Sequence, residues 1–223
     1  MTKQIRPNEL IRILRPEFGA LGSGGAGTAG ADIDITGSVI SRSGNAILLF
    51  DSGGAILQEY EATAVGLGDA IADAASGDVI WLPAVQISGD FTIPAGVHVI
   101  GVSRYASQIL GEVTLEAGAT LEHLTVSHTD STAGTIYGVI GPQASTGTVK
   151  ISNCDITVTN NGAGDAIGVF LDQDTTIMEV WISSIYALSV GGDGYAGYRA
   201  PATTAAMYIF NGRAEGSTDP FNE

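Results

Sequence analysis

The sequence predicts an all-β fold, a parallel β-helix in which short strands stack coil upon coil as a solenoid. The first observation is a repeat: Gly89–Val99 (GDFTIPAGVHV) returns 22 positions later as Gly111–Leu121 (GEVTLEAGATL). Repetition at a fixed period is typical of solenoids, in which each repeat buries its apolar side against the next. The second observation is that apolar residues alternate within each repeat, which indicates strands. The third is the Ala-Gly pair in each repeat, which allows a tight corner between two strands.

A basic arm and a linker are predicted for residues 1–30, ahead of the coils. Residues 1–15 carry four basic residues and one acidic residue, a net of about +3, whereas the rest of the chain carries five and 23, about −18. Leu21–Gly30 is glycine-rich, as expected of a flexible tether. The alternative for the arm is a frayed terminus that docks on nothing. The anchoring interpretation assigns these side chains to a partner surface: Lys3, Arg6, Leu10, Ile11, Arg12, Ile13, Leu14 and Arg15.

Short strands and one helix are predicted between the linker and the first coil. Residues 31–62 are predicted to form short strands, Ile33–Ile35, Ser38–Ile40 and Ala46–Phe50 among them, and to serve as a neck and association region. Residues 63–76 are predicted as a helix that caps the solenoid, covering its apolar end and its unpaired strand edges. Gly77 is expected to end this helix. Its apolar residues recur at helical spacing: Leu67, Ala70, Ile71 and Ala74.

Residues 77–190 are predicted to form the β-helix itself. Steps of 20, 24, 32 and 26 residues separate the apolar residues taken as one per coil: Ile80, Ile100, Leu124, Ile156 and Ile182. The longest step contains Thr129–Ser145, predicted as a loop at a corner. After Leu188 the chain is expected to leave the coils, residues 191–223 forming a closing segment and tail with a last strand at Met207–Phe210. The side chains predicted to point inward are Val79, Phe91, Ile93, Val99, Val113, Leu115, Leu121 and Ile156.

Composition argues against several classes of function. A formal net charge of −15 disfavours non-specific nucleic-acid binding, which needs clustered basic residues. No apolar run is long enough to cross a bilayer, and the first residues lack the apolar stretch of a secretory signal, so synthesis in the cytoplasm without membrane insertion is expected. The single cysteine, Cys154, lies in the apolar run Ile151–Val158 and is predicted to be a buried, unreactive thiol.

The pattern as a whole resembles a known superfamily. The helix followed by Gly77–Pro83 (GDVIWLP), the coil Phe91–Gly101 and the weaker coils after it resemble the right-handed parallel β-helix of the pectin-lyase-like superfamily. The likeness is closest to the short β-helix proteins encoded by tailed bacteriophages, and it covers about residues 61–190. It implies a right-handed solenoid, but it implies no particular activity, because this fold hosts lyases, hydrolases, adhesins and inert fibres.

Four acidic residues form the best candidate for chemistry: Asp155, Asp165, Asp172 and Asp174. They suggest the acid pair of a glycoside hydrolase or a calcium site. The favoured interpretation is that they are solvated corner residues in a chain with 24 acidic residues. The basic residues after the linker are not expected to pair with carboxylates at coil spacing: Arg42, Arg104, Lys150, Arg199 and Arg213. No catalytic residue, metal or cofactor is therefore predicted.

Two further groups carry weaker hypotheses. His123, His128 and Asp130, together with Ser127, suggest a catalytic triad, but residues spaced along one strand point to alternating faces, so they are predicted not to converge. Asn153 is predicted to join a ladder of side chains inside a corner of the solenoid.

The function favoured by these observations is that of a non-enzymatic structural virion protein of a tailed bacteriophage. It is expected to assemble as a homotrimer, with residues 1–20 anchored to capsid or tail proteins and the acidic solenoid facing the host surface or its glycans. The missing leader supports this, because phage proteins reach the exterior by lysis. The alternative is a tailspike-like polysaccharide depolymerase, either a lyase or a glycoside hydrolase. A cell-surface adhesin is the third hypothesis.

Overall fold

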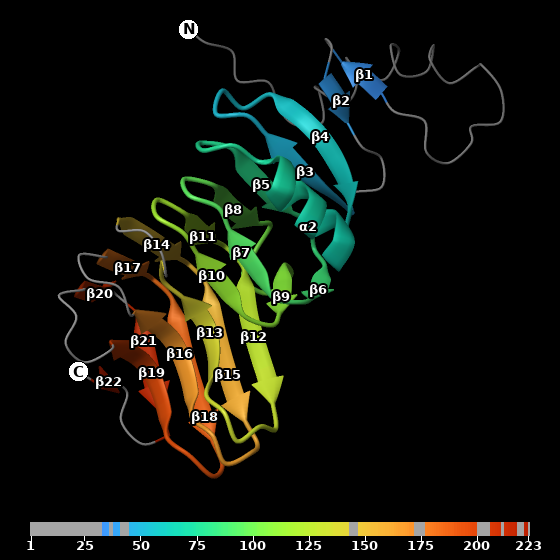
Figure 1. Cartoon of the computed structure of the whole chain (residues 1–223). Coiled ribbons are helices and arrows are strands. Elements are labelled where there is room, and N and C mark those ends of the chain that lie inside the picture. The colour runs from blue at the N-terminus through green and yellow to red at the C-terminus, as the bar shows by residue number, and fades with distance from the viewer. Residues whose placement is uncertain are drawn as a thin grey trace, which may run out of the picture. The chain divides into compact units, whose positions relative to one another are not determined.

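The computed structural model describes residues 33–35, 38–40, 45–142, 147–171, 177–199, 206–210, 212–217 and 221–222 (Figure 1). The chain divides into two compact units, Met1–Ser43 and Gly44–Glu223. In the first unit, β1 (Ile33–Ile35) pairs with β2 (Ser38–Ile40) in antiparallel register, as a pair of the predicted short strands. The predicted anchoring residues of the arm lie outside the described residues.

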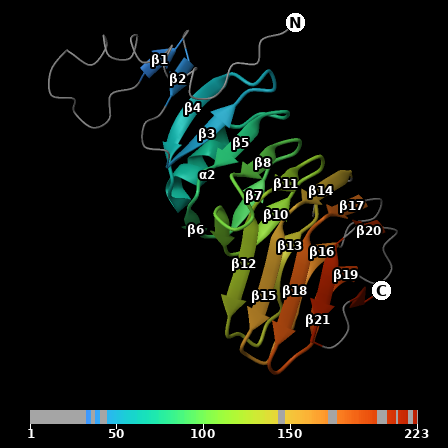
Figure 2. The ribbon, with the colours of Figure 1, turned by 180° about the vertical axis from the view of Figure 1, so that it is seen from behind.

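Three parallel sheets make up most of the second unit (Figures 1 and 2). From β5 onward, consecutive strands belong to the three sheets in turn, so that every third strand lies in the same sheet. The β5 sheet contains β5 (Val79–Leu82), β8 (His98–Gly101), β11 (Thr120–Glu122), β14 (Thr148–Ser152), β17 (Ile177–Trp181) and β20 (Ala206–Phe210). The β6 sheet contains β6 (Gln86–Ser88), β9 (Gln108–Leu110), β12 (Thr125–Asp130), β15 (Asp155–Asn160), β18 (Ser184–Ser189) and β21 (Arg213–Gly216). The β7 sheet contains β7 (Phe91–Ile93), β10 (Val113–Leu115), β13 (Ile136–Ile140), β16 (Ala166–Leu171), β19 (Gly194–Arg199) and β22 (Phe221–Asn222).

Three consecutive strands, one in each sheet, are called a coil below, from coil 1 (β5–β7) to coil 6 (β20–β22). The prediction of an all-β fold with parallel sheets is confirmed, and the arrangement is consistent with a β-helix or solenoid. The register confirms the repeat: Phe91 pairs with Val113 and Ile93 with Leu115 on the neighbouring coil, just as the two copies of the repeat align.

The core lies between the three sheets, and most of the predicted inward residues are in it. Six of them are buried: Ile93, Val99, Val113, Leu115, Leu121 and Ile156. Phe91 packs against the core but stays partly exposed, because β7 is the edge strand of its sheet. The prediction for Val79 is wrong, since Ile80 and Leu82 are the buried residues of β5. Four consecutive apolar residues form this strand, so period-two alternation could not tell which of them point inward.

A hairpin and a helix precede coil 1. Strands β3 (Ala46–Phe50) and β4 (Ile56–Glu61) pair with each other, and β3 pairs antiparallel with β5, so the hairpin extends the β5 sheet. Helix α2 (Ala64–Asp73) buries Leu67 and Ala70, as its spacing predicted. The side-chain oxygen of Thr63 accepts a hydrogen bond from the Gly66 N–H and caps the helix.

Two glycines near this helix have defined roles, and that of Gly77 differs from the prediction. At Gly66 a Cβ atom would lie 2.0 Å from the carbonyl oxygen of Glu61, so the helix–hairpin contact requires glycine despite its low helix propensity. Gly77 does not end the helix: Ala74 is already extended, and Gly77 sits in the following turn with a φ of +95°. No helix of the described residues is long and apolar enough to span a membrane.

The later coils differ from the prediction in two respects. Thr129–Ser145 is not simply a loop, because its first two residues end β12 and β13 lies in its middle. The coils also continue past Leu188. Strand β19 pairs with β16 of coil 4, and the three strands of coil 6, β20, β21 and β22, each pair with a strand of coil 5. The expected closing segment therefore contains coiled strands as well as the predicted strand at Met207–Phe210.

Candidate functional site

A concave feature of the described residues lies where coil 3 extends beyond coil 2. Strand β9 pairs only with Thr125–Ser127 of β12, whereas β15 pairs with all six β12 residues. His128, Thr129 and Asp130 therefore project past the shorter coil and form a ledge. A cavity of about 410 Å³ lies on this ledge, bounded above by residues of coils 1 and 2: Asp90, Leu110 and Gly111.

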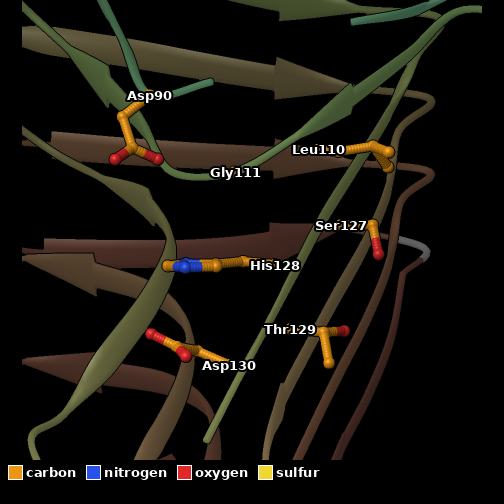
Figure 3. Close-up of a pocket in the computed structure, with 7 residues that line it drawn as sticks. All are labelled: Asp90, Leu110, Gly111, Ser127, His128, Thr129 and Asp130. Atoms are coloured by element: carbon orange, nitrogen blue, oxygen red, sulfur yellow. The ribbon is translucent and has the colours of Figure 1, made fainter. Parts of the chain in front are cut away.

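The ledge presents acidic and imidazole groups on one side. Figure 3 shows His128 and Asp130 projecting from one face of β12, while Ser127 and Thr129 project from the other. This corrects one step of the triad argument, because His128 and Asp130, two positions apart on the strand, do share a face. Ser127 does not join them, so the predicted lack of a convergent triad holds for this strand.

The upper wall depends on a glycine of the repeat. Gly111 has a φ of +151°, and a Cβ atom there would lie 2.3 Å from the carbonyl oxygen of Gly89 on the coil before. Only glycine permits this close approach of two corners. The acidic residues that follow these glycines are brought together as a result: the Glu112 N–H donates a hydrogen bond to Asp90 Oδ1 at 2.7 Å.

Protonation on the ledge follows from its hydrogen bonds and charges. His128 Nδ1 lies 2.6 Å from the carbonyl oxygen of Tyr137, and a carbonyl can only accept, so Nδ1 carries a proton and Nε2 is the nitrogen open to a ligand. Burial raises the pKa of the Glu112 carboxyl, the negative charge of Asp90 raises it further, and His128 partly offsets both. The imidazole and carboxylates that line the cavity can therefore form hydrogen bonds with hydroxyl-bearing groups.

The predicted acidic cluster is divided in the structure. Asp155 begins β15, whereas Asp165 lies beyond the other end of that strand and accepts a hydrogen bond from the Asp193 N–H at 2.9 Å. Asp172 and Asp174 lie outside the described residues. One basic residue does pair with a carboxylate, because the Arg104 guanidinium lies 3.7 Å from the Asp155 carboxylate, but these residues are two coils apart and not at the successive-coil spacing of the sequence prediction.

His123 and Asn153 form part of a corner ladder. His123, Asn153 and Ile182 all have left-handed backbone angles at the same corner of successive coils, and Asn153 Nδ2 lies 2.6 Å from His123 Nδ1. This ladder is on the surface rather than inside the corner as predicted. It also places His123 at the opposite end of β12 from His128.

The asparagine buried at the end of β15 is Asn160, which the sequence analysis missed. It is fully buried, its amide group donates to the carbonyl oxygens of Gly134 and Asp165, and its Oδ1 accepts from the N–H groups of Thr132 and Gly162. The signal that could have identified it is an Asn-Asn-Gly turn directly after an alternating strand.

Aromatic residues on the outer faces were missed as well. On the β7 sheet, Tyr137, Phe170 and Tyr198 contact one another across coils 3 to 5, with ring centroids 4.9 and 5.7 Å apart. On the β5 sheet, Trp181 and Phe210 stack at 4.1 Å with an angle of 18° between their planes. They could have been found only by aligning coils of unequal length.

Burial agrees with the prediction for Cys154, which is fully inaccessible, and desolvation raises the pKa of its thiol to about 12. Among the described residues, no group of three or more His, Cys, Asp or Glu side chains is arranged to hold a metal ion. No family model, curated protein or solved structure matches the chain.

Proposed function

We propose that the chain is a structural component of a tailed-bacteriophage particle, a right-handed β-helix of the pectin-lyase-like kind that contacts host-surface glycans. Its residues 1–20 anchor it to capsid or tail proteins, and its coils face outward. The observation that carries the proposal is the in-register pairing of all six coils. It aligns outward side chains in straight rows on rigid strands, and repetitive rows of this kind suit an extended ligand such as a polysaccharide.

The uneven charge of the chain supports different binding partners for the N-terminal arm and for the rest of the protein. The arm carries a net of about +3 and the remainder about −18, so the two ends favour different partners. Association with sibling chains, as a homotrimer, is assigned to the β3–β4 hairpin. β4 is the outer strand of the β5 sheet, with Ile56 and Leu57 exposed, and an edge strand with exposed apolar side chains favours pairing or packing.

Particle purification tests this function. Particles released by lysis of cells that carry the gene are banded on a density gradient, and the chain is detected in the band with an antibody. The full chain is expected in the band, whereas a chain lacking residues 1–20 stays in the soluble fraction as a folded oligomer. Replacing Lys3, Arg6, Arg12 and Arg15 by glutamine, in the full-length chain, separates charge from length. A truncated chain that incorporates normally contradicts the proposal.

The ledge supports a second candidate, a tailspike-like polysaccharide depolymerase. The specific observation is that Glu112, whose pKa is raised, lies beside Asp90 and His128, and these two residues line the cavity. Incubation with neutral and acidic capsule polysaccharides, followed by assays for reducing ends and for unsaturated products, tests it. Turnover that is lost in Glu112→Gln and in Asp130→Asn, but kept in Thr129→Ser, favours the enzyme. If only Asp172→Asn or Asp174→Asn abolishes turnover, the activity belongs to the acidic cluster predicted from the sequence.

A further inference from the structure

The two faces of the Trp181 indole differ in their neighbours: one stacks on an aromatic ring of coil 6, and the other is directed towards coil 4. It belongs to an outward row of the β5 sheet in which Glu122 pairs with Ser152, Ser152 with Trp181, and Trp181 with Phe210. Phe210, on coil 6, stacks on one face of the indole at 4.1 Å. Figure 2 shows β14, β17 and β20 following one another along the sheet, so the other face of the indole is directed towards β14.

The face towards β14 is left open by the size of the side chain there. Neighbouring strands lie about 4.8 Å apart, which is close to an aromatic stacking distance, so a ring on β14 would close this face as Phe210 closes the other. The residue in register is Ser152, whose side chain is too short to cover an indole. The space next to the Ser152 side chain is called the notch, and the indole of Trp181, on coil 5, forms its aromatic wall.

Polar groups surround the notch. Lys150 shares the outer face of β14 with Ser152, and Glu179, in register with Lys150, accepts a hydrogen bond from Trp181 Nε1 at 3.2 Å. The Asn153 side chain follows Ser152 at the corner, and Glu122 lies one coil earlier. A hydroxyl, an amide, an ammonium and two carboxylates are thus available around one ring face.

We propose that this notch, defined by Trp181 and Ser152, binds one pyranose unit of a neutral host-surface glycan; this rests on the proposed function and assigns a site to it. The C–H face of a sugar ring packs against the indole, and the hydroxyl groups at its rim exchange hydrogen bonds with Ser152, Lys150 and Glu179. Such amphipathic matching requires an aromatic wall with polar neighbours, and the notch has both.

Charge selects neutral over anionic sugars. The groups at the notch are one basic residue, Lys150, and two acidic residues, Glu122 and Glu179, and the chain has a formal net charge of −15. An anionic sugar would meet repulsion from the whole body as well as from two nearby carboxylates. A neutral hexose or N-acetylhexosamine meets none.

Tryptophan fluorescence provides the test. The chain contains two tryptophans, so Trp81→Phe leaves Trp181 as the only reporter. The Trp81→Phe chain is titrated with oligosaccharides of glucose, galactose, mannose and N-acetylglucosamine, with oligogalacturonate as the anionic comparator. We expect a saturable change in emission with at least one neutral series, and weaker binding of oligogalacturonate.

Two variants locate the site without relying on a fluorescent tryptophan, with calorimetry as the readout. Trp181→Ala removes the aromatic wall, and Ser152→Phe fills the notch while preserving the stack of Trp181 on Phe210. Each should weaken binding about tenfold or more. Ser88→Phe is the matched control, because Ser88 is an exposed serine on β6 of coil 1, far along the sheets from the notch, and it should change affinity less than about twofold.

The possible outcomes separate the site from the function. Glycan binding that survives both Trp181→Ala and Ser152→Phe overturns the notch and leaves glycan contact in place. No binding by the wild-type chain overturns both the notch and glycan contact, while particle incorporation is judged separately. An oligomer that dissociates in Trp181→Ala with no glycan bound, measured by analytical ultracentrifugation, overturns the notch as well, because the aromatic surface is then an interface between copies.

Discussion

The inward side chains of coils 1 and 2 are apolar like those of coils 3 to 5, but the outward side chains of the two groups differ in chemistry. On the β7 sheet the inward row is apolar throughout, with Phe91 followed by Val113, Val139 and Val169 in register. The outward row begins with Thr92 and Thr114 and continues with Ile140, Phe170 and Tyr198. The inner row is therefore constrained by packing in every coil, whereas the outer row changes from hydroxyls to aromatic rings.

The change in exterior coincides with a change in strand length. β7 and β10 have three residues each, whereas β13, β16 and β19 have five or six. Longer strands carry more outward positions, and the step between short and long coils creates the ledge at His128–Asp130. The ledge on β12 and the proposed notch on β14 and β17 both lie on the longer strands of coils 3 to 5.

The largest effect is expected from breaking the shared interior. Ile80 in coil 1 and Ile151 in coil 4 occupy one inward row and are both fully buried. Ile80→Ala and Ile151→Ala should each lower the free energy of unfolding by about 2–5 kcal/mol, because each leaves a cavity in a packed core. Urea denaturation followed by circular dichroism measures both, with Thr92→Ala as the exposed control. A cost below about 1 kcal/mol at only one site would show that the two interiors are not equivalent.

The same comparison explains how much could be predicted from the sequence. The segment from β7 to β8 has the same length as that from β10 to β11, so the two copies of the repeat align by eye and the pairing of Phe91 with Val113 could be predicted. Coils from β12 onward differ in strand and turn length, so no fixed period relates Trp181 to Phe210 or Tyr137 to Phe170. The ledge depends on β12 being longer than β9, which neither strand's sequence reveals alone.

Contacts between residues far apart in the chain could not be predicted from the sequence either. Arg104 and Asp155 are two coils apart, and only the register of Gln108, Thr125 and Asp155 brings their corners together. By contrast, burial of Cys154 needed only its apolar neighbours, and the helix at Ala64–Asp73 needed only its own spacing. Local patterns were predictable, and surfaces assembled from several coils were not.

A second prediction concerns the turns of the longer coils. Asn160→Ala removes a buried side chain that satisfies two carbonyl oxygens and two N–H groups, and it should cost about 1–3 kcal/mol. Asn153→Gly removes the side chain from the exposed corner ladder and keeps the left-handed backbone accessible, so it should cost no more than about 0.5 kcal/mol. Urea midpoints of the two variants measure the difference. Equal costs would contradict the view that Asn160, rather than Asn153, holds the later coils together from within.

A third prediction concerns the ion pair that joins an early coil to a later one. Arg104 and Asp155 approach to 3.7 Å, but their side chains are 30 % and 27 % exposed, so solvent screens their attraction. A double-mutant cycle with Arg104→Met and Asp155→Asn should give a coupling energy of about 1 kcal/mol or less, decreasing with added salt. A coupling above about 2 kcal/mol would mean that this pair, and not the shared core, links the two regions.

The smallest effect is expected at the ledge, and it depends on pH. The pKa of Glu112 is raised in the folded protein by burial and by Asp90, so the folded state holds this proton more tightly than the unfolded chain does. Ionised Glu112 therefore destabilises the fold above its folded pKa, and this cost is relieved as pH falls through that pKa towards the unfolded value. Glu112→Gln removes the charge at every pH, so it should stabilise the protein at pH 7 and give no gain near pH 4. Urea denaturation at the two values measures this, with Glu116→Gln, on the same coil, as the control. A stabilisation independent of pH would show that Glu112 contributes no titration to the ledge, and the depolymerase candidate would then lose its acid–base group.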